Sequence, residues 1–242
     1  MIEDRLLMNM NLSEVQVAAK HRTILEIPYL EIDARPTLLL GANGAGKSTL
    51  LNVLAGLRKV SHGSVHTVGN VTLIEQQFRP IVGFNALEYC AYTAWLQGQK
   101  QVQARKNAQG WLEFVGLQEV MEQRCEHLSG GEQARLAIAT GLNTGADTLL
   151  LDEPSAALDP LHKNEISRVY ERIVAGGHRL LVSTHDAGEI QSPFQRVLVL
   201  DHGRICFDGA CPEFFAVAQT PSDHPAKQLA QSFLRRRGNY AA

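Results

Sequence analysis

The sequence predicts an α/β fold with a mostly parallel sheet, and three short apolar runs carry this prediction. The runs are residues 37–40, 148–151 and 180–184. None of them alternates with polar residues, which is typical of parallel strands buried on both faces. The segments that follow are the glycine-rich residues 41–48, Asp152 with Glu153, and His185 with Asp186. Because ligands of open parallel sheets bind at the carboxyl ends of the strands, we expect these segments to form one site.

The first 37 residues predict short strands of a small sheet. Residues 15–17 and 24–27 alternate in part between apolar and polar side chains, the pattern of a half-buried strand. Pro28 follows the second segment, and because proline cannot donate to a strand ladder we expect it to interrupt the strand. Several short strands are therefore expected here.

Residues 77–129 predict a helical insertion. The segment is rich in glutamine and holds seven aromatic residues, which are Phe78, Phe84, Tyr89, Tyr92, Trp95, Trp111 and Phe114. Aromatic side chains contribute strongly to core burial, so we expect most of these rings to form the insertion's own core. For Phe78 and Phe84, near its start, a docking surface is the alternative.

Two further segments follow the third apolar run. Residues 197–200 and 205–207 flank a turn at residues 201–204 and predict an antiparallel hairpin. The tail, residues 216–242, contains three consecutive arginines at positions 235–237. We expect a solvated helix or a frayed end there, with contact to anionic lipid as the alternative.

Composition and charge exclude several classes of protein. The 242 residues include 23 Lys plus Arg and 25 Asp plus Glu, a formal net charge of −2, so we expect no nucleic-acid partner. No apolar stretch approaches the ~20 residues of a membrane-spanning helix, and the first residues lack the pattern of a secretory signal. We therefore expect a cytoplasmic protein. The four cysteines, Cys90, Cys125, Cys206 and Cys211, lack metal-ligand spacing and are expected to be reduced thiols.

Residues 41–48 fit the pattern G-x-x-x-x-G-K-[ST] between a predicted strand and a predicted helix at 49–55. The glycines allow backbone N–H groups to surround phosphate oxygens, and the helix N-terminus favours anions. Lys47 supplies a charge for the outer phosphates, and Ser48 supplies a hydroxyl ligand for Mg²⁺. The segment therefore predicts a P-loop. The residues expected to bind nucleotide are Gly41, Asn43, Gly44, Ala45, Gly46, Lys47, Ser48 and Thr49.

Two adjacent carboxylates follow the second apolar run. Side chains alternate along a strand, so Asp152 and Glu153 point in different directions. We expect Asp152 to hold Mg²⁺ through its hydration shell and Glu153 to polarise the attacking water as a general base. An acidic pair after a strand is also typical of a helix N-cap, and the pair alone does not decide between the two interpretations.

A second anion-binding segment precedes the helix-forming residues 134–139. It consists of Ser129, Gly130, Gly131 and Glu132. A serine and glycines at a helix start present N–H groups to an anion, as the P-loop does. Because one P-loop suffices for one nucleotide, the second segment suggests contact with a nucleotide bound to another molecule.

Taken together, these motifs resemble those of the ATP-binding cassette (ABC) family of ATPases, over roughly residues 10–215. Residues 41–48 match the Walker A loop, 149–152 the Walker B strand, 128–132 the LSGGQ signature with Glu in its last place, and 155–159 the D-loop. The resemblance implies catalytic roles for Glu153 as base, His185 as switch histidine, Lys47, and Gln76 as Q-loop glutamine. It also implies that Ser48, Gln76 and Asp152 hold the Mg²⁺ that accompanies ATP.

The resemblance implies a single ABC ATPase domain over residues 1–242. A P-loop NTPase core with a small N-terminal antiparallel β-subdomain would comprise residues 1–76 and 130–215, with an inserted helical subdomain at 77–129 and a tail at 216–242. It further implies a head-to-tail pair of chains, as a homodimer or with a second ABC ATPase. Each nucleotide would bind between one P-loop and the other chain's residues 129–132, with Asp159 coupling the two sites.

The family's usual partner is an integral membrane transporter subunit, which would place this chain on the inner face of the cell membrane. Phe78, Arg79 and Phe84 are expected to contact that partner. Residues 86–98 are similar to cassettes of export systems, which favours export. A micronutrient or metal-chelate importer is the alternative. The sequence ends soon after the core, which disfavours the long regulatory extension of many sugar importers and leaves this alternative open. A soluble ABC ATPase acting as a scaffold in repair or translation is a further hypothesis, disfavoured by the lack of long coiled-coil insertions and of a second cassette.

The sequence departs from the family at the position of the aromatic residue that stacks on adenine. Residues 18–22, a short distance before the P-loop, are Ala-Ala-Lys-His-Arg and contain no aromatic ring of the Phe, Tyr or Trp type. His21 or Arg22 could stack on the base instead, and a plain exposed loop is equally consistent. We expect weak base selectivity, with GTP bound alongside ATP.

Overall fold

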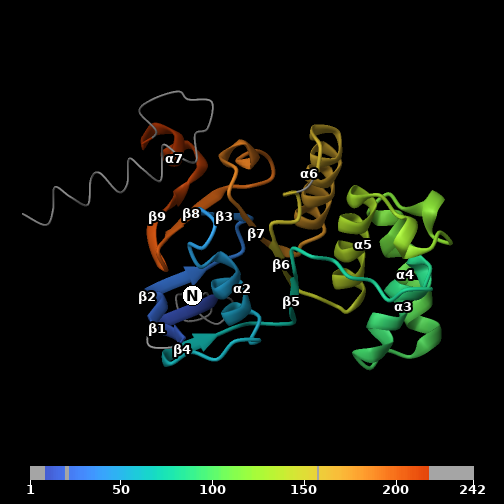
Figure 1. Ribbon diagram of the computed structural model, residues 1–242, viewed down its shortest axis with the longest axis horizontal. Helices are drawn as coiled ribbons and strands as arrows, with labels where there is room; N and C mark the ends of the chain where they lie inside the picture. Colours follow the sequence, from blue (N-terminus) through green and yellow to red (C-terminus); the bar gives the residue numbers. More distant parts are fainter. Residues whose placement is uncertain (1–8, 20–21, 157, 218–242) are drawn as a thin grey trace, which may run out of the picture. The chain divides into compact units, whose positions relative to one another are not determined.

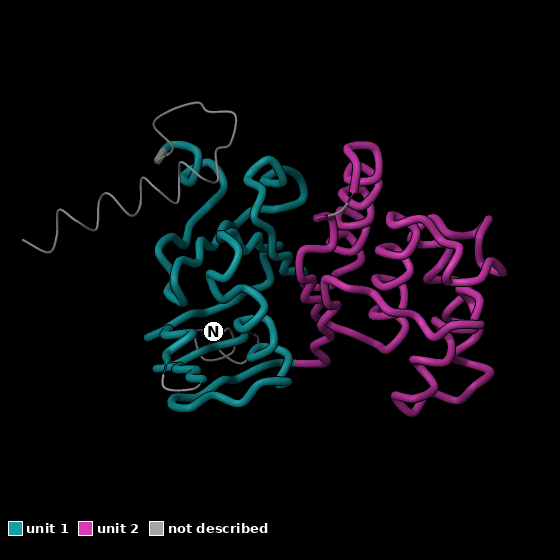
Figure 2. The backbone as a smooth tube through the Cα atoms, in the orientation of Figure 1, with its two compact units in different colours: residues 1–68, 180–242 teal, residues 69–179 magenta. Residues whose placement is uncertain are grey.

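The computed structural model describes residues 9–19, 22–156 and 158–217. Figure 2 shows that the chain divides into two compact units. Unit 1 comprises residues 1–68 and 180–242, and unit 2 comprises residues 69–179. The tail beyond Val217, with its three arginines, lies outside the described residues.

Unit 1 begins with a three-stranded antiparallel sheet in the order β2-β1-β4, which confirms the N-terminal prediction (Figure 1). Its strands are β1 (Met10–Ala19), β2 (Arg22–Ile32) and β4 (His62–His66). Apolar side chains alternate on β1 and β2, so one face of the sheet is buried. Leu12, Val15, Leu25 and Ile27 are all at most 1% exposed.

Pro28 does not interrupt β2, contrary to the prediction from the sequence. The strand continues through it because the ladder with β1 skips Glu14, which has a left-handed φ of 53°. The paired residues on either side of the gap are Ser13 with Tyr29 and Val15 with Ile27. The missing N–H of Pro28 therefore falls where the ladder is already locally broken, which is where a strand tolerates proline.

Unit 1 also holds the strand that precedes the P-loop. β3 (Thr37–Leu40) pairs in parallel with β7 (Arg179–Thr184) and with β8 (Arg196–Asp201). β9 (Arg204–Ala210) pairs antiparallel with β8, and Asp201 faces Arg204 across the turn, so the predicted hairpin is confirmed. The helical elements are α2 (Lys47–Leu54), η3 (Ala187–Glu189) and α7 (Cys211–Val217).

The described residues of unit 2 combine two parallel strands with four α-helices. β5 (Val71–Ile74) pairs with β6 (Thr148–Asp152). The α-helices are α3 (Ala86–Leu96), α4 (Gln101–Phe114), α5 (Gly130–Asn143) and α6 (Pro160–Ala175), and short turns of 3₁₀-helix lie at η1 (Gln118–Val120) and η2 (Cys125–His127). Figure 1 shows α3, α4 and α5 packed side by side, as their contacts require. Among the described residues, no helix combines the length and apolarity needed to cross a membrane.

Small aliphatic side chains, not aromatic rings, form the core between α3, α4 and α5. On α3 and α4 the buried residues are Ala86, Leu87, Cys90, Ala94, Ala104, Ala108 and Leu112, and on α5 they include Leu136, Ala137, Ile138, Ala139 and Leu142. None of the seven aromatic residues of this segment is among the buried residues, and Trp95 is 48% exposed. Alanine lets helices approach closely, which leaves no room for rings between them. The expectation that most of these rings form the core is therefore wrong.

A buried amide ties the three helices together. The Nδ2 group of Asn143, near the end of α5, donates to the carbonyl oxygens of Cys90 on α3 at 2.9 Å and Ala104 on α4 at 3.1 Å. Asn143 is 1% exposed. Cys90 is itself fully buried, and this burial raises the pKa of its thiol to about 12. The cysteine therefore stays protonated and uncharged at neutral pH.

Candidate nucleotide-binding and catalytic site

The turn between β3 and α2 has the backbone conformation of a phosphate-binding loop. Gly44 and Gly46 have left-handed φ values of 80° and 108°, which glycine adopts without steric cost. A Cβ atom at Gly41 would lie 2.6 Å from the carbonyl oxygen of Leu200, so the loop passes close to β8. The three glycines of the sequence motif are therefore required by this local geometry.

The loop is held in place from the β8–β9 turn. The N–H of Gly203 donates to the carbonyl oxygen of Ala45 at 2.8 Å. The carbonyl oxygen of Gly203 in turn accepts from the N–H of Glu26 on β2 at 2.8 Å, and a Cβ at Gly203 would lie 2.1 Å from the oxygen of Ile24. A backbone bridge thus joins the loop to both sheets of unit 1.

Lys47 directs its charge into the loop. Its Nζ donates to the carbonyl oxygens of Gly41 at 2.7 Å and Ala42 at 3.2 Å, and the residue is 5% exposed. Gly46 is the N-cap of α2 and has no side chain, so the first N–H groups of the helix receive no side-chain cap. A buried cation beside an uncapped helix start favours an anion.

His185 lies next to the start of this loop. β3 and β7 are in register with Leu40 opposite Thr184, and the N–H of Gly41 donates to the oxygen of Thr184 at 3.2 Å. His185 follows Thr184 directly and is exposed. The structure of unit 1 thus brings together the predicted P-loop and the predicted switch histidine.

In unit 2, the carboxyl ends of β5 and β6 bring Gln76 close to the two carboxylates. Ile74 pairs with Leu151, so Asp152, the last residue of β6, and Gln76, two residues after the end of β5, lie at the same edge of the strand pair. Asp152 is 8% exposed. Glu153 has a φ of 46°, a left-handed value that is rare for glutamate and that costs on the order of 1–3 kcal/mol. Such strain is typical of functional positions.

A cavity of about 510 Å³ joins four of the predicted motifs within unit 2. Gln76, Gly130, Glu153 and Leu158 line it, one from each of the Q-loop, signature, Walker B and D-loop segments. Phe78 and Arg79 line the same cavity, with the Arg79 guanidinium donating to Gln77 Oε1 at 2.5 Å. Gln133, which the sequence interpretation missed, also lines it, and its Nε2 donates to the oxygen of Leu128 at 2.9 Å. Its place one turn after Ser129 on α5 is the signal that could have found it.

Ser129 and Glu132 form a capping box at the start of α5. The carboxylate of Glu132 accepts from the Ser129 N–H at 2.7 Å and from its hydroxyl at 2.9 Å, and the Ser129 hydroxyl accepts from the Glu132 N–H. The spacing S-x-x-E is the sequence signal for this arrangement. The segment expected to bind phosphate therefore already holds one anion, its own glutamate.

Asp159 forms the N-cap of α6. Its Oδ1 accepts from the N–H of His162 at 3.0 Å, and Pro160 occupies the first helical position. The hydrogen bond from that N–H, with one from the His162 ring, lowers the pKa of the Asp159 carboxyl. The D-loop aspartate is exposed and stays ionised well below neutral pH. Ala157, in the same loop, and Lys20 and His21, in the predicted base-binding region, lie outside the described residues.

The strand, glycine loop and helix of unit 1 define a P-loop nucleotide-binding protein. The family model described as ABC transporter matches residues 33–156, slightly more than half of the chain. The chain belongs to the ABC transporter family and is one of its ATPase cassettes. This confirms the recognition made from the motifs, the P-loop NTPase fold and the ATPase activity expected of it.

Similar proteins differ in length and in what their names describe. The macrolide export ATP-binding/permease protein MacB of Rhodopseudomonas palustris is 30% identical over 87% of this chain, but the chain spans only 35% of its length. The arginine transport ATP-binding protein ArtM of Bacillus subtilis is 30% identical over 90% of this chain and 94% of its own length. The dimeric structure of MJ0796, a bacterial ABC transporter cassette, is 23% identical with a TM-score of 0.71, and the match covers 84% of this chain and 98% of that one.

Proposed function

We propose that this chain is the ATP-hydrolysing subunit of a membrane transporter and that it works as one of two paired cassettes. The observation that carries the proposal is the presence of two anion-binding helix starts in one chain, at Lys47 and at Gly130. Only the first combines a buried lysine with left-handed glycines. A P-loop alone suffices for the chain's own nucleotide, so the second serves the nucleotide of a partner cassette, which is either a second copy or another ABC ATPase.

Nucleotide binding is assigned to the P-loop. In this proposal, the N–H groups from Gly44 to Thr49 surround the phosphates, and Lys47 exchanges its two carbonyl partners for phosphate oxygens. Ser129, Gly130 and Gly131 of the partner cassette contact the outermost phosphate, which requires Glu132 to release Ser129. Asp159, the N-cap residue of α6, couples the two nucleotide sites of the paired cassettes.

The donor set assigned to Mg²⁺ fits that ion. Ser48, Gln76 and Asp152 offer a hydroxyl, an amide oxygen and a carboxylate, all hard oxygen ligands, and Mg²⁺ is usually held by one or two carboxylates together with substrate phosphates. In the described part of the chain, no cluster of three His, Cys, Asp or Glu side chains forms an all-protein metal site. When bound, the ion would neutralise charge on the phosphates.

Hydrolysis is assigned to Glu153. Its left-handed φ and its position on the wall of the 510 Å³ cavity set its carboxylate apart from that of buried Asp152. Glu153 would orient and deprotonate the attacking water, and Lys47 would stabilise the charge that develops on the phosphate oxygens. His185, at the end of β7, would contact the terminal phosphate from the P-loop side.

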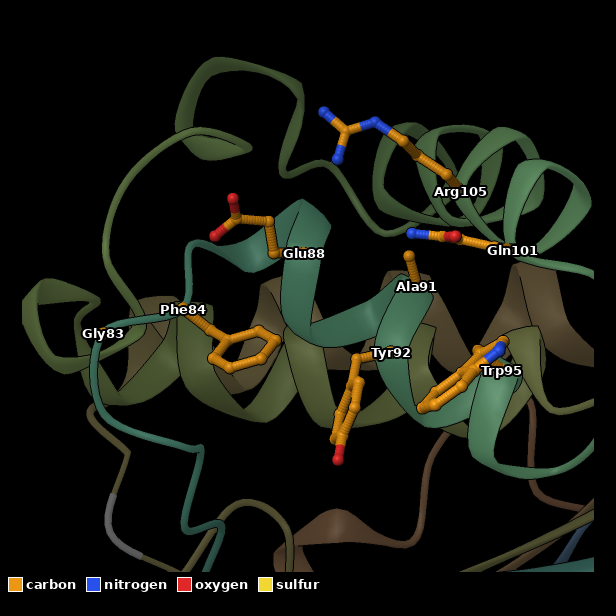
Figure 3. Close-up of a pocket in the computed structure, with 8 residues that line it drawn as sticks. All are labelled: Gly83, Phe84, Glu88, Ala91, Tyr92, Trp95, Gln101 and Arg105. Carbon is orange, nitrogen blue, oxygen red and sulfur yellow. The ribbon is translucent and has the colours of Figure 1, made fainter.

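A second pocket in unit 2 is the proposed docking site for the membrane subunit. It has a volume of about 530 Å³ and is lined by Gly83, Phe84, Glu88, Ala91, Tyr92, Trp95, Gln101 and Arg105. Figure 3 shows the rings of Phe84, Tyr92 and Trp95 in a row along α3, with neighbouring ring centroids 5.3 and 5.7 Å apart. Glu88 and Arg105 lie on the other side of the pocket. An aromatic row beside charged groups fits an amphipathic helix of the partner.

The structure separates the three residues expected to contact the partner. Phe84 lines this docking pocket, whereas Phe78 and Arg79 line the cavity that holds Gln76 and Glu153. Phe84 is therefore the residue with which to test docking. In this proposal, Phe78 and Arg79 sense the state of the catalytic cavity that they line.

Export is the preferred direction of transport. It is supported by the similarity of residues 86–98 to export cassettes and by the export function in the name of MacB. Import is the second candidate, because the name of ArtM gives a transport function without specifying export. The topology of the membrane partner decides between the two directions.

The test is to isolate the chain from its host in mild detergent, as wild type, as Glu153→Gln, and as Glu153→Gln with Phe84→Ala. We expect a polytopic membrane protein to copurify with the first two and to be lost with the third. Phe114→Ala is the matched control, because this half-exposed ring of unit 2 contacts Trp111 outside the pocket. Recovery of soluble proteins alone would overturn the transporter assignment in favour of a soluble scaffold.

A further inference from the structure

His162 holds the D-loop carboxylate at two points. Its backbone N–H donates to Asp159 Oδ1 at 3.0 Å, and its ring Nδ1 lies 2.8 Å from Asp159 Oδ2. Because a carboxylate can only accept, Nδ1 carries the proton in this contact. The first bond is an ordinary N-cap interaction that any residue except proline would make. The second is specific to the histidine side chain.

The same ring lies against the signature segment. A Cβ atom built on Gly131 would lie 2.5 Å from His162 Cδ2 and 3.0 Å from its Cγ. Gly131 is buried in the first turn of α5, and no left-handed φ requires glycine there. The absence of a side chain at Gly131 is thus explained by the imidazole that occupies this space. One residue before it, Gly130 faces Leu158 of the D-loop, with a Cβ-to-Cδ2 separation of 3.5 Å.

The charged neighbours on the two helices have other partners. Arg135 of α5 forms an ion pair with Glu165 of α6, and Glu132 is held in the capping box with Ser129. In the described part of the chain, the carboxylates of Glu132 and Glu165 contact Ser129 and Arg135, whereas the His162 ring contacts that of Asp159. The imidazole is 32% exposed, and its position follows from Asp159 on one edge and Gly131 on the other.

From these contacts we infer that His162 is a positioning residue that sets the D-loop carboxylate of Asp159 relative to the signature segment at Gly131. The inference rests on the proposed function, in which both segments face a second cassette. The ring acts through Asp159 and Gly131 and touches no reacting atom. Its removal should therefore lower turnover in the paired state and leave the affinity of the P-loop for nucleotide unchanged, since His162 is not part of the P-loop.

The first test compares His162→Ala with His162→Asn, whose amide nitrogen can replace Nδ1 as the donor to Asp159. For the full chain, we expect kcat for ATP hydrolysis to fall roughly 10-fold in His162→Ala, since small displacements of active-site groups can cost up to about 100-fold. We expect the dissociation constant for ATP to stay unchanged, and His162→Asn to recover most of kcat. Asn164→Ala, an exposed change on the same helix, is the matched control. Equal activity of all four proteins would overturn the inference.

The second test needs no catalytic activity and addresses the contact with Gly131. Gly131→Ala should shift the unfolding equilibrium roughly 10- to 100-fold toward the unfolded state, the usual cost of overpacking. In the His162→Ala background the same substitution should have almost no effect, because the ring that it meets is absent. Equal costs in both backgrounds, measured by urea denaturation, would show that His162 does not occupy this space and would overturn the inference.

The two tests separate the inference from the proposed function. If the wild-type chain and its copurified partner hydrolyse no ATP, the proposed function fails, and the denaturation cycle still decides whether His162 packs on Gly131. If hydrolysis is normal and His162→Ala matches wild type, the proposed function stands and the positioning role fails.

Discussion

The two units hold their parts of the candidate site by different means. In unit 1, the P-loop is fixed by backbone: left-handed glycines, the bridge from Gly203, and a lysine bonded to two carbonyl oxygens of its own loop. In unit 2, side chains fix one another: Glu132 with Ser129, His162 with Asp159. Lys47 is 5% exposed, whereas Gln76, Ser129 and Asp159 are all exposed.

The backbone-held part of the site, in unit 1, is complete in a single chain. Backbone donors that are fixed before the ligand arrives lose little entropy on binding, so unit 1 is suited to bind phosphate by itself. In unit 2, the exposed side chains are hydrogen-bonded to one another, so these bonds must be exchanged for bonds to the ligand before the residues can act. We therefore expect changes in unit 1 to alter nucleotide affinity and changes in unit 2 to alter turnover and pairing.

The largest effect should come from Glu153→Gln in unit 2. We expect hydrolysis to fall about 100- to 10,000-fold, the usual contribution of a general base, with nucleotide affinity retained. Glutamine keeps the shape of the side chain and removes the charge and the basic oxygen. The measurement pairs steady-state ATPase with equilibrium binding of a fluorescent ATP analogue. Light scattering should also show an ATP-dependent dimer.

Glu119→Gln, at an exposed position of η1, is the control for the loss of one negative charge in unit 2. Near wild-type turnover in Glu153→Gln would remove this residue as the base. A simultaneous loss of ATP binding would break the comparison itself, because it would mean that a group of unit 2 contributes to affinity.

The second largest effect should come from Lys47→Ala in unit 1. A hydrogen bond to a charged group contributes about 1.5–3 kcal/mol, so we expect ATP affinity to fall roughly 10- to 100-fold. Lys59→Ala, an exposed lysine of the same unit, should leave affinity unchanged. Calorimetric titration with ATP measures both. Loss of turnover at unchanged affinity would contradict the assignment of phosphate binding to this lysine.

The parts of the fold that the sequence predicts well are those that a local pattern determines. The P-loop is predictable because its turn needs glycine at Gly44 and Gly46 and a close approach at Gly41, so the residue types and the backbone require one another. The apolar runs likewise predict buried strands from a local pattern, because a strand that is buried on both faces needs apolar residues at every position. The hairpin around Asp201 and Arg204 follows from a turn sequence between two short apolar segments.

The predictions that failed depend on packing between distant residues. Pro28 is accommodated because Glu14, on another strand, leaves the ladder at the facing position. The aromatic rings after Gln76 are half-buried or, at Trp95, exposed, because alanines such as Ala94 and Ala104 close the helix interfaces. The sequence shows that the aromatic residues and the alanines of this segment are both apolar, but it does not show which of them face the neighbouring helices. The contact of His162 with Gly131, likewise, depends on how α5 packs on α6.

A smaller effect is expected from Glu132→Gln, which frees the signature segment of unit 2 from its capping carboxylate. The carboxylate of Glu132 holds the two groups of Ser129 that would contact phosphate, and its charge opposes an approaching anion. In the Glu153→Gln background, we expect the ATP-dependent dimer to tighten about 3- to 10-fold, because charges at helix starts contribute roughly 0.3–1 kcal/mol or somewhat more. Unfolding stability should fall slightly, since glutamine loses the attraction to the helix dipole.

Analytical ultracentrifugation across ATP concentrations measures this dimer. Glu119→Gln again controls for net charge. A dimer weakened by Glu132→Gln would mean that the carboxylate contributes to pairing, and the capping box would then be part of the closed state instead of an obstacle to it.

The smallest effect should be the discrimination between ATP and GTP. Arg22 is exposed at the start of β2, two residues before Ile24, whose carbonyl oxygen faces Gly46 of the P-loop. A guanidinium plane stacks on either purine. Residues 18, 19 and 22 are Ala, Ala and Arg, and none of them has an aromatic ring that would favour one base over the other. We expect the two dissociation constants to differ by less than about threefold, a difference of roughly 0.6 kcal/mol or less.

Competition binding with a labelled nucleotide measures the ratio of the two constants, and Arg22→Ala should weaken the binding of ATP and of GTP equally. A tenfold or greater preference for ATP would show that affinity is not set by the phosphate-binding backbone of unit 1 alone.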